Sequence, residues 1–217
     1  MALGVACTGC PLSRTLPQRN RKAVHRQIRG EVLEFLHNHC SIAFSRTRLP
    51  HGGFHYRQAL TWATNPEWSP EEVARTLDIA QRRQGLLARP NFRFEALLSE
   101  AVLRYTVGSP TVMVAQVKHL LGQSEMPSVE VRILPNTETS AVGLMSRSFV
   151  LFSFPPLPSS KLQEPPVAFM EGLTGDLYIE RDLEVARFSR EAERIRHVAL
   201  SPSASQDLML RITKERE

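Results

Sequence analysis

Three serine–proline pairs constrain the fold of this chain more than any other feature, because each marks the beginning of a helix. They are Ser69-Pro70, Ser109-Pro110 and Ser201-Pro202. A serine at the N-cap accepts a hydrogen bond from a backbone N–H that has no helical partner, and proline suits the first helical position. At the first pair, Glu72 completes a capping box. The sequence therefore predicts helices that open at these three points.

Apolar side chains at helical spacing support this prediction and add a further helix at about 182–199. After Ser69 the face includes Val73, Leu77 and Ala80, and the pattern ends before Pro90. The segment 182–199 carries a single apolar stripe, as expected for a helix with one buried face. Its members are Val185, Phe188, Ala192, Ile195 and Ala199.

Strand patterns lie between these helices. Residues 129–133 alternate strictly between apolar and polar, which predicts one buried and one wet face. Residues 148–154 are almost continuously apolar, and 167–171 and 176–180 flank a glycine-bounded turn typical of a hairpin. Residues 92–98 favour a strand, although their composition leaves a helix open. The fold class is therefore α+β, with a mixed or antiparallel sheet of about five strands flanked by helices.

The N-terminal segment differs from the rest in charge. Residues 1–57 contain nine Lys or Arg and two acids, together with all three cysteines and most of the histidines. We interpret residues 1–60 as a basic His/Cys-containing segment, partly helical at about 18–39 or disordered, with a loop at 44–57, and residues 61–217 as the α+β domain. Lys22, Arg26 and Arg29 form a cationic ridge on the predicted helix. This ridge could contact nucleic-acid phosphates, or it is an ordinary solvated face.

Neither a membrane span nor a cofactor is expected. No apolar run approaches the ~18–20 residues that cross a bilayer, so we expect a cytoplasmic protein without membrane partners. Cys7 and Cys10 have the spacing of a zinc-ligand pair, but His37, His39 and Cys40 lack the usual spacing of a second pair. Reduced thiols and surface histidines are the simpler interpretation, and no metal is predicted.

Enzyme signatures are missing from the sequence, since it has no phosphate-binding glycine loop, nucleophile elbow or dinucleotide fingerprint. One set of polar residues remains as a candidate ligand- or partner-binding site. The set is Glu100, Arg104, Arg132, Glu171 and Tyr178. If these side chains converged in one closed pocket, a small-molecule enzyme would be the alternative function. Glu100 and Arg104 are four residues apart, which on a helix also predicts a simple ion pair.

The order of motifs from about residue 69 to 210 resembles one family. The matching segments are Arg82 to Leu87, Glu100 to Arg104, Val107-Gly108, Val112-Met113 with Gln116 and His119 to Leu121, Val129 to Pro135, Phe169 to Glu180, and Ala199 to Pro202 with Ser205. They resemble the C-terminal domain of unknown function in actinomycete WhiJ-like, antitoxin-like transcriptional regulators. In that family the domain follows a helix-turn-helix head of the XRE type, and no such head is recognisable in residues 1–68.

The resemblance implies a regulatory sensing or partner-binding domain that takes part in transcription regulation through protein–protein interaction. It supplies no catalytic residues. The expected partner is a small regulatory protein or a small-molecule ligand, with a homodimer left open. DNA would be a partner only if a helix-turn-helix head were supplied elsewhere, or if the basic N-terminal segment bound nucleic acid directly.

Overall fold

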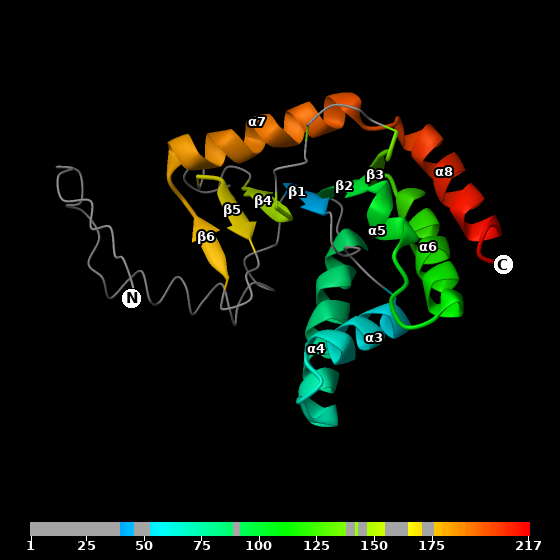
Figure 1. Cartoon of the computed structure of the whole chain (residues 1–217). Coiled ribbons are helices and arrows are strands. Elements are labelled where there is room, and N and C mark those ends of the chain that lie inside the picture. The colour runs from blue at the N-terminus through cyan, green and yellow to red at the C-terminus, as the bar shows by residue number, and fades with distance from the viewer. Residues whose placement is uncertain are drawn as a thin grey trace, which may run out of the picture. The chain divides into compact units, whose positions relative to one another are not determined.

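The computed structural model describes residues 40–45, 53–88, 92–137, 142, 147–154, 165–170 and 176–217, and for residues 40–45 it describes the backbone alone. The contacts of residues 37–217 make them one unit. Within the described ranges the chain forms a mixed sheet with helices on both faces (Figure 1). The predicted α+β class is confirmed.

The sheet has six strands in the described part of the chain, one more than expected. They are β1 (Cys40–Ser45), β2 (Arg93–Ser99), β3 (Val129–Leu134), β4 (Phe149–Ser153), β5 (Val167–Met170) and β6 (Leu177–Ile179), in the order β3-β2-β1-β4-β5-β6. β1 is parallel to β2, and β2 to β3, whereas the β1–β4, β4–β5 and β5–β6 pairs are antiparallel. The five predicted strands are all present. The sixth, β1, comes from the basic N-terminal segment and pairs on both sides.

Three helices, α4 (Pro70–Gln84), α6 (Pro110–Ser124) and α8 (Pro202–Lys214), begin at the prolines of the three serine–proline pairs, as predicted. The others in the described ranges are α3 (Phe54–Thr64), a 3-10 turn η1 (Gly85–Ala88), α5 (Glu100–Arg104) and α7 (Asp182–Val198). The Glu72 N–H donates to Ser69 Oγ at 3.3 Å and the Ser69 N–H donates to Glu72 Oε2 at 2.8 Å, which is the expected capping box. The side chains of Ser109 and Ser201 cap α6 and α8 by accepting from the N–H groups of Val112 and Ala204, without a returning side-chain bond among the described residues.

The loop predicted at residues 44–57 is wrong at both ends, since Ser45 closes β1 and Phe54 opens α3. No local signal announces α3, because its N-cap is Gly53, which has no capping side chain. The side chain of Gln116 on α6 provides the contact instead. Its Oε1 accepts a hydrogen bond of 2.6 Å from the Gly53 N–H, across 63 residues of sequence. A tertiary contact therefore fixes the start of this helix.

The sheet is covered by different helices on its two faces. On one face α7 packs over the strands, burying Val185, Ala192 and Ile195 against Leu97 of β2 and against β4 and β5 (Figure 1). The alternating residues of β2 and β3 point to the opposite face, where α6 and α8 contact β3. The core of that second layer includes Phe94, Ala96, Leu98, Val131, Ile133, Met113, Val117, Leu208, Met209 and Ile212.

The connection between α7 and α8 is held on the outer edge of β3. The Leu200 N–H donates to the Ile133 carbonyl at 2.9 Å, and the Ile133 N–H donates to Ser205 Oγ at 3.0 Å. Ser205 is fully buried as a result. These bonds satisfy backbone groups that an edge strand would otherwise leave open, and they fix the end of α7 beside β3.

Candidate functional site

An open pocket lies where the C-terminal half of α7 passes over β3. Its volume is about 470 Å³. It is lined by Arg132 of β3, by Glu193, Arg196 and His197 of α7, and by Ala199 and Ser201 of the α7–α8 connection. Arg132 is one of the residues that the sequence analysis proposed. The other lining residues follow from the geometry of α7, whose positions 193, 196 and 197 share one helical face.

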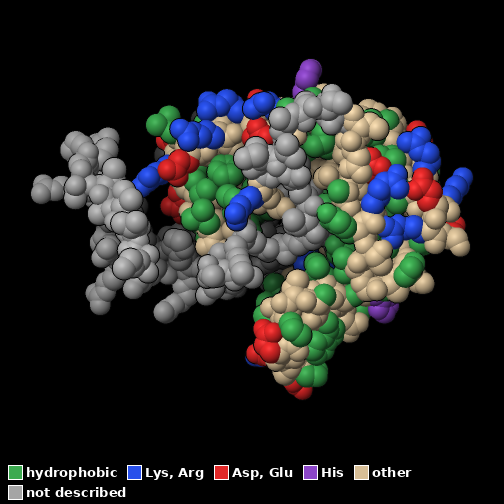
Figure 2. Space-filling model, viewed as in Figure 1, with side chains coloured by type: hydrophobic (Ala, Val, Ile, Leu, Met, Phe, Trp, Pro, Cys, Tyr) green, Lys and Arg blue, Asp and Glu red, His purple; other side chains and the backbone are tan. Residues whose placement is uncertain are grey.

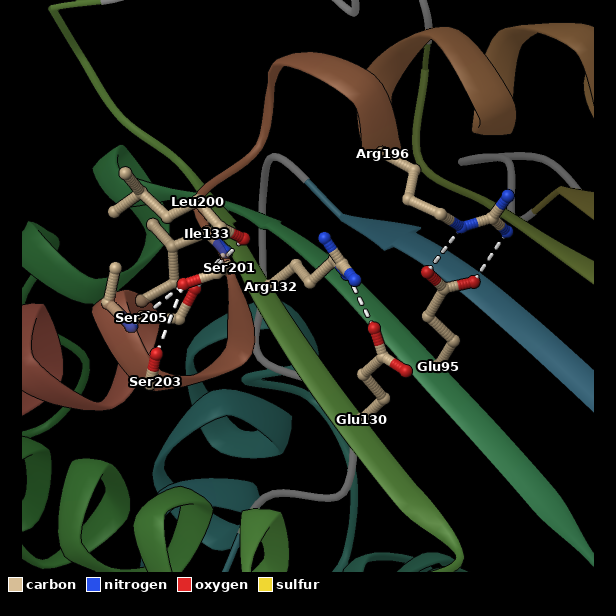
Figure 3. Close-up of polar contacts among 10 residues, drawn as sticks. Glu95, Glu130, Arg132, Ile133, Arg196, Leu200, Ser201, Ser203 and Ser205 are labelled. Carbon is tan, nitrogen blue, oxygen red and sulfur yellow. Dashed lines mark hydrogen bonds and ion pairs between the residues drawn. The ribbon is translucent and has the colours of Figure 1, made fainter.

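One wall of the pocket is fixed by a bidentate ion pair between α7 and the sheet. Arg196 Nε and a terminal nitrogen of its guanidinium each donate to a carboxylate oxygen of Glu95 on β2, both at 2.6 Å (Figure 3). The Glu95 side chain is 13 % exposed and that of Arg196 is 34 % exposed. The hydrogen bonds to Glu95 raise the pKa of Arg196, although burial acts in the opposite direction. Arg196 is therefore a fully charged, positioned part of the wall.

Arg132 is held in a different way, because only part of its guanidinium is engaged. Its Nε donates to Glu130 Oε1 at 2.5 Å, from two positions along the same strand. Figure 3 shows this single dashed contact, with the rest of the group directed away from Glu130. Among the described residues, the terminal nitrogens of Arg132 have no hydrogen-bond partner. Its side chain as a whole is 25 % exposed.

Glu193 and His197 stand on α7 beside Arg196, and both are exposed. Within the described ranges, Glu193 forms no ion pair, although its charge acts on Arg196 from a distance. Ser201 contributes a hydroxyl that caps α8 by accepting from the Ala204 N–H at 3.2 Å. As far as the described residues go, the pocket thus presents an incompletely engaged guanidinium from the strand side and a carboxylate without an ion pair from the helix side.

Glu100 and Arg104 form the ion pair that their spacing predicts, at the start of α5. Arg104 Nε donates to Glu100 Oε1 at 2.6 Å, and the Asn136 N–H donates to Glu100 Oε2 at 2.8 Å. Burial alone raises the pKa of Glu100, but the bonds from Asn136 and Arg104 outweigh it and leave the pKa lowered. Arg104 also pairs with Glu215 at 2.9 Å, and its hydrogen bonds to Glu100 and Glu215 raise its pKa. This cluster ties α5 to the end of α8.

The remaining predicted residues are not brought to the pocket. Tyr178 lies on β6, and its ring packs against Phe169 with centroids 5.0 Å apart. β6 and β3 are opposite edges of the sheet, so five strand spacings, roughly 24 Å, separate Tyr178 from Arg132. Glu171 lies outside the described residues, as do Lys22, Arg26 and Arg29 of the predicted nucleic-acid ridge. The four described residues of the set proposed from sequence therefore do not lie together in one closed pocket.

The zinc site that the sequence analysis considered and did not predict lies outside the described side chains, since Cys7, Cys10, His37 and His39 are not among the described residues and only the backbone of Cys40 is described. In the part that is described, no group of three or more His, Cys, Asp or Glu side chains could hold a metal ion. The described helices include none that is long and apolar enough to cross a membrane.

Comparison with known proteins identifies the domain by its sequence. No curated protein and no solved structure matches the chain. A family model does match, and it spans residues 54–211, from the first residue of α3 into the last turn of α8. The pocket residues from Arg132 to Ser201 all lie inside this span. Because the match covers most of the chain, the protein belongs to the family described as "Domain of unknown function (DUF5753)".

Proposed function

We propose that this chain is a regulatory recognition domain that binds a small charged ligand in the pocket between α7 and β3. The observation that carries the proposal is the state of the charges around the pocket. Arg196 is fixed by two hydrogen bonds to Glu95, while the terminal N–H donors of Arg132 have no partner in the part of the chain that the structure describes. A guanidinium with free, directed donors is a common device for recognising carboxylate or phosphate groups.

The electrostatics favour binding over catalysis. A general acid or base works best with a pKa near the pH of the reaction. Here the pKa of Glu100 is lowered while those of Arg104 and Arg196 are raised, so each of these groups is held more firmly in its charged form. Such groups position side chains and hold elements together. The enzyme alternative from the sequence is thus not supported by its own residues, of which Arg132 and Tyr178 lie on opposite sheet edges.

In the regulatory setting that the sequence resemblance implies, ligand binding here would tune a transcription regulator. DNA contact would come from a helix-turn-helix head supplied elsewhere. The pocket adjoins the α7–α8 connection, which is bonded to Ile133 at the edge of β3. A ligand that contacts both Arg132 and Ser201 would tie this connection to the sheet, and a change there would reach α8.

The test is a nuclear magnetic resonance titration of the full chain with three probes. These are sodium acetate, inorganic phosphate and an equimolar mixture of the twenty standard amino acids. We expect at least one probe to shift the backbone amides of Ala199 and Ser201 saturably, and Arg132→Gln to weaken the binding of that probe by about tenfold or more. The matched control is Arg194→Gln, which removes an exposed α7 guanidinium whose partner is Glu191. Absence of a saturable shift for all three probes, or an unchanged affinity in Arg132→Gln, would contradict the proposal.

A further inference from the structure

The pocket carries charges of both signs on opposite walls: Arg132, whose Nε alone is bonded to Glu130, and Glu193, which forms no ion pair within the described residues. Arg132 extends from β3, and Glu193 extends from α7. Among the described side chains the two form no ion pair with each other, although both line the same 470 Å³ pocket. Arg196 is already matched by Glu95 and Arg132 is partly matched by Glu130. The pocket therefore offers one site for a negative group and a separate site for a positive group.

Carboxylates in and beside the pocket argue against a purely anionic ligand. Glu193 lines the pocket, and Glu130 and Glu95 are bonded to its two guanidiniums. An inorganic phosphate bound at Arg132 would gain charged hydrogen bonds but would share the site with Glu193 and lie close to Glu130. Like charges at short range oppose binding, and partial burial weakens the screening that water provides. A ligand that also carries a positive group avoids this repulsion by placing that group at Glu193.

We infer that the ligand is a zwitterion of the α-amino-acid class, with its carboxylate on Arg132 and its ammonium group on Glu193. This inference rests on the proposed function and specifies the ligand of the same pocket. Five of the six lining residues carry a polar or charged group, and Ala199 is the apolar member. The volume lies within the range of small-molecule sites, which runs from about 300 to 1,000 Å³. His197, an exposed residue in the last, C-terminal turn of α7, also lines the pocket.

The arrangement is set before the ligand arrives. The Glu95–Arg196 pair fixes the last turns of α7, and the bonds of Leu200 and Ser205 to Ile133 fix the connection that follows. Figure 2 shows Lys and Arg side chains over α7 with acidic side chains among them, so the outer surface of this helix carries charges of both signs. When side chains are already ordered in the free protein, binding loses less conformational entropy, which matters most for a ligand with few atoms.

The test compares four small probes on the full chain, with the pocket amides and the affinity as readouts. Glycine carries both charges, acetate has only the carboxylate, methylammonium has only the ammonium, and N-acetylglycine is glycine with its amine blocked. We expect glycine to bind tightest, with each single-charge probe weaker by about tenfold to a hundredfold, since a charged hydrogen bond contributes ~1.5–3 kcal/mol. Glu193→Gln should reduce glycine to the level of acetate, and Arg132→Gln should reduce it to the level of methylammonium.

The outcomes separate the two claims. If acetate and N-acetylglycine bind as well as glycine and Glu193→Gln changes nothing, the zwitterion inference is wrong while the recognition pocket stands. If glycine fails but the mixed amino acids bind in an Arg132-dependent and Glu193-dependent way, the class is right and the side chain contributes. If phosphate binds more tightly than glycine, the charge argument is overturned. If nothing shifts the pocket amides, both proposals fail. Arg194→Gln serves as the control for each probe.

Discussion

Replacing Glu95 by Gln tests whether the ion pair between β2 and α7 holds the pocket wall in place. Glutamine keeps the size of the side chain and one acceptor oxygen, but it removes the negative charge. It also turns an N–H2 group toward a guanidinium nitrogen that had been donating. We expect α7 to lose part of its attachment to the sheet, and the free energy of unfolding to fall.

The expected size follows from the exposure of the two partners. Breaking a fully buried ion pair by removing one member costs about 3–5 kcal/mol, whereas an exposed pair contributes about 0–1 kcal/mol. Glu95 is 13 % exposed and Arg196 is 34 % exposed, so water screens the arginine side of the pair. An intermediate loss of about 2 kcal/mol is expected. For a chain of this length that corresponds to a decrease in Tm of roughly 4–8 °C.

Urea denaturation followed by circular dichroism measures this loss, and a double-mutant cycle with Arg196→Gln isolates the pair. The coupling energy between positions 95 and 196 should exceed about 1 kcal/mol. The control Arg194→Gln breaks an exposed contact of 3.4 Å to Glu191 and should cost less than about 0.5 kcal/mol. If Glu95→Gln is no more destabilising than this control, or the coupling is near zero, the pair does not hold α7 on the sheet.

Three further predictions follow from other parts of the fold. The pKa of Glu100 in the folded chain lies below its ordinary value of 4.5, so the charged carboxylate stabilises the fold above that pH and this contribution is lost on acidification. The difference in the free energy of unfolding between the wild-type chain and Glu100→Gln, measured by urea titration, should therefore become smaller below about pH 4.5. Gly108→Ala should lower the free energy of unfolding by about 2 kcal/mol, since residue 108 has a φ of +72° and a Cβ would lie 2.9 Å from that of Ala59; Gly122→Ala, in open space within α6, should instead be neutral or stabilising. A fragment of residues 61–217 should resist proteolysis far less than residues 37–217, because it lacks β1; equal resistance would show that the predicted boundary at residue 60 is correct.

Local patterns in the sequence predict most helices and strands of this domain. The capping serines, the strict alternation of β3 and the single stripe of α7 each appear within a short window, and the structure confirms them. β1 and the start of α3 were not predicted from local patterns, and the reason is the same for both. β1 is defined by pairing with β2 and β4, both distant in sequence, and α3 begins where Gln116 binds Gly53. Elements whose ends depend on tertiary contacts have no local signature.

The pocket was only partly predictable for the same reason. Arg132 was proposed from sequence, and Glu100 with Arg104 could be assigned as an ion pair from their spacing on one helix. Glu95, Arg196 and Glu193 were missed. One signal was available, since Glu95 lies between Phe94 and the apolar run 96–98 of β2, and a carboxylate in such a place needs a cationic partner. The identity of that partner was not available, because Arg196 lies 101 residues away and pairs only through the packing of α7 on the sheet.

The family match and the pocket geometry can be combined in one physical argument. The matched span contains both walls of the pocket, and those walls belong to segments separated by about sixty residues, β3 and the end of α7. Two separate sets of bonds hold these segments together. One is the Glu95–Arg196 pair between β2 and α7, and the other is the pair of bonds from Leu200 and Ser205 to the backbone of Ile133 at the edge of β3. These bonds fix the positions from which Arg132 and Glu193 extend. Among the described residues Glu193 forms no ion pair and the terminal nitrogens of Arg132 have no hydrogen-bond partner. The proposal of a small dipolar ligand rests on this combination of fixed walls and incompletely matched charges.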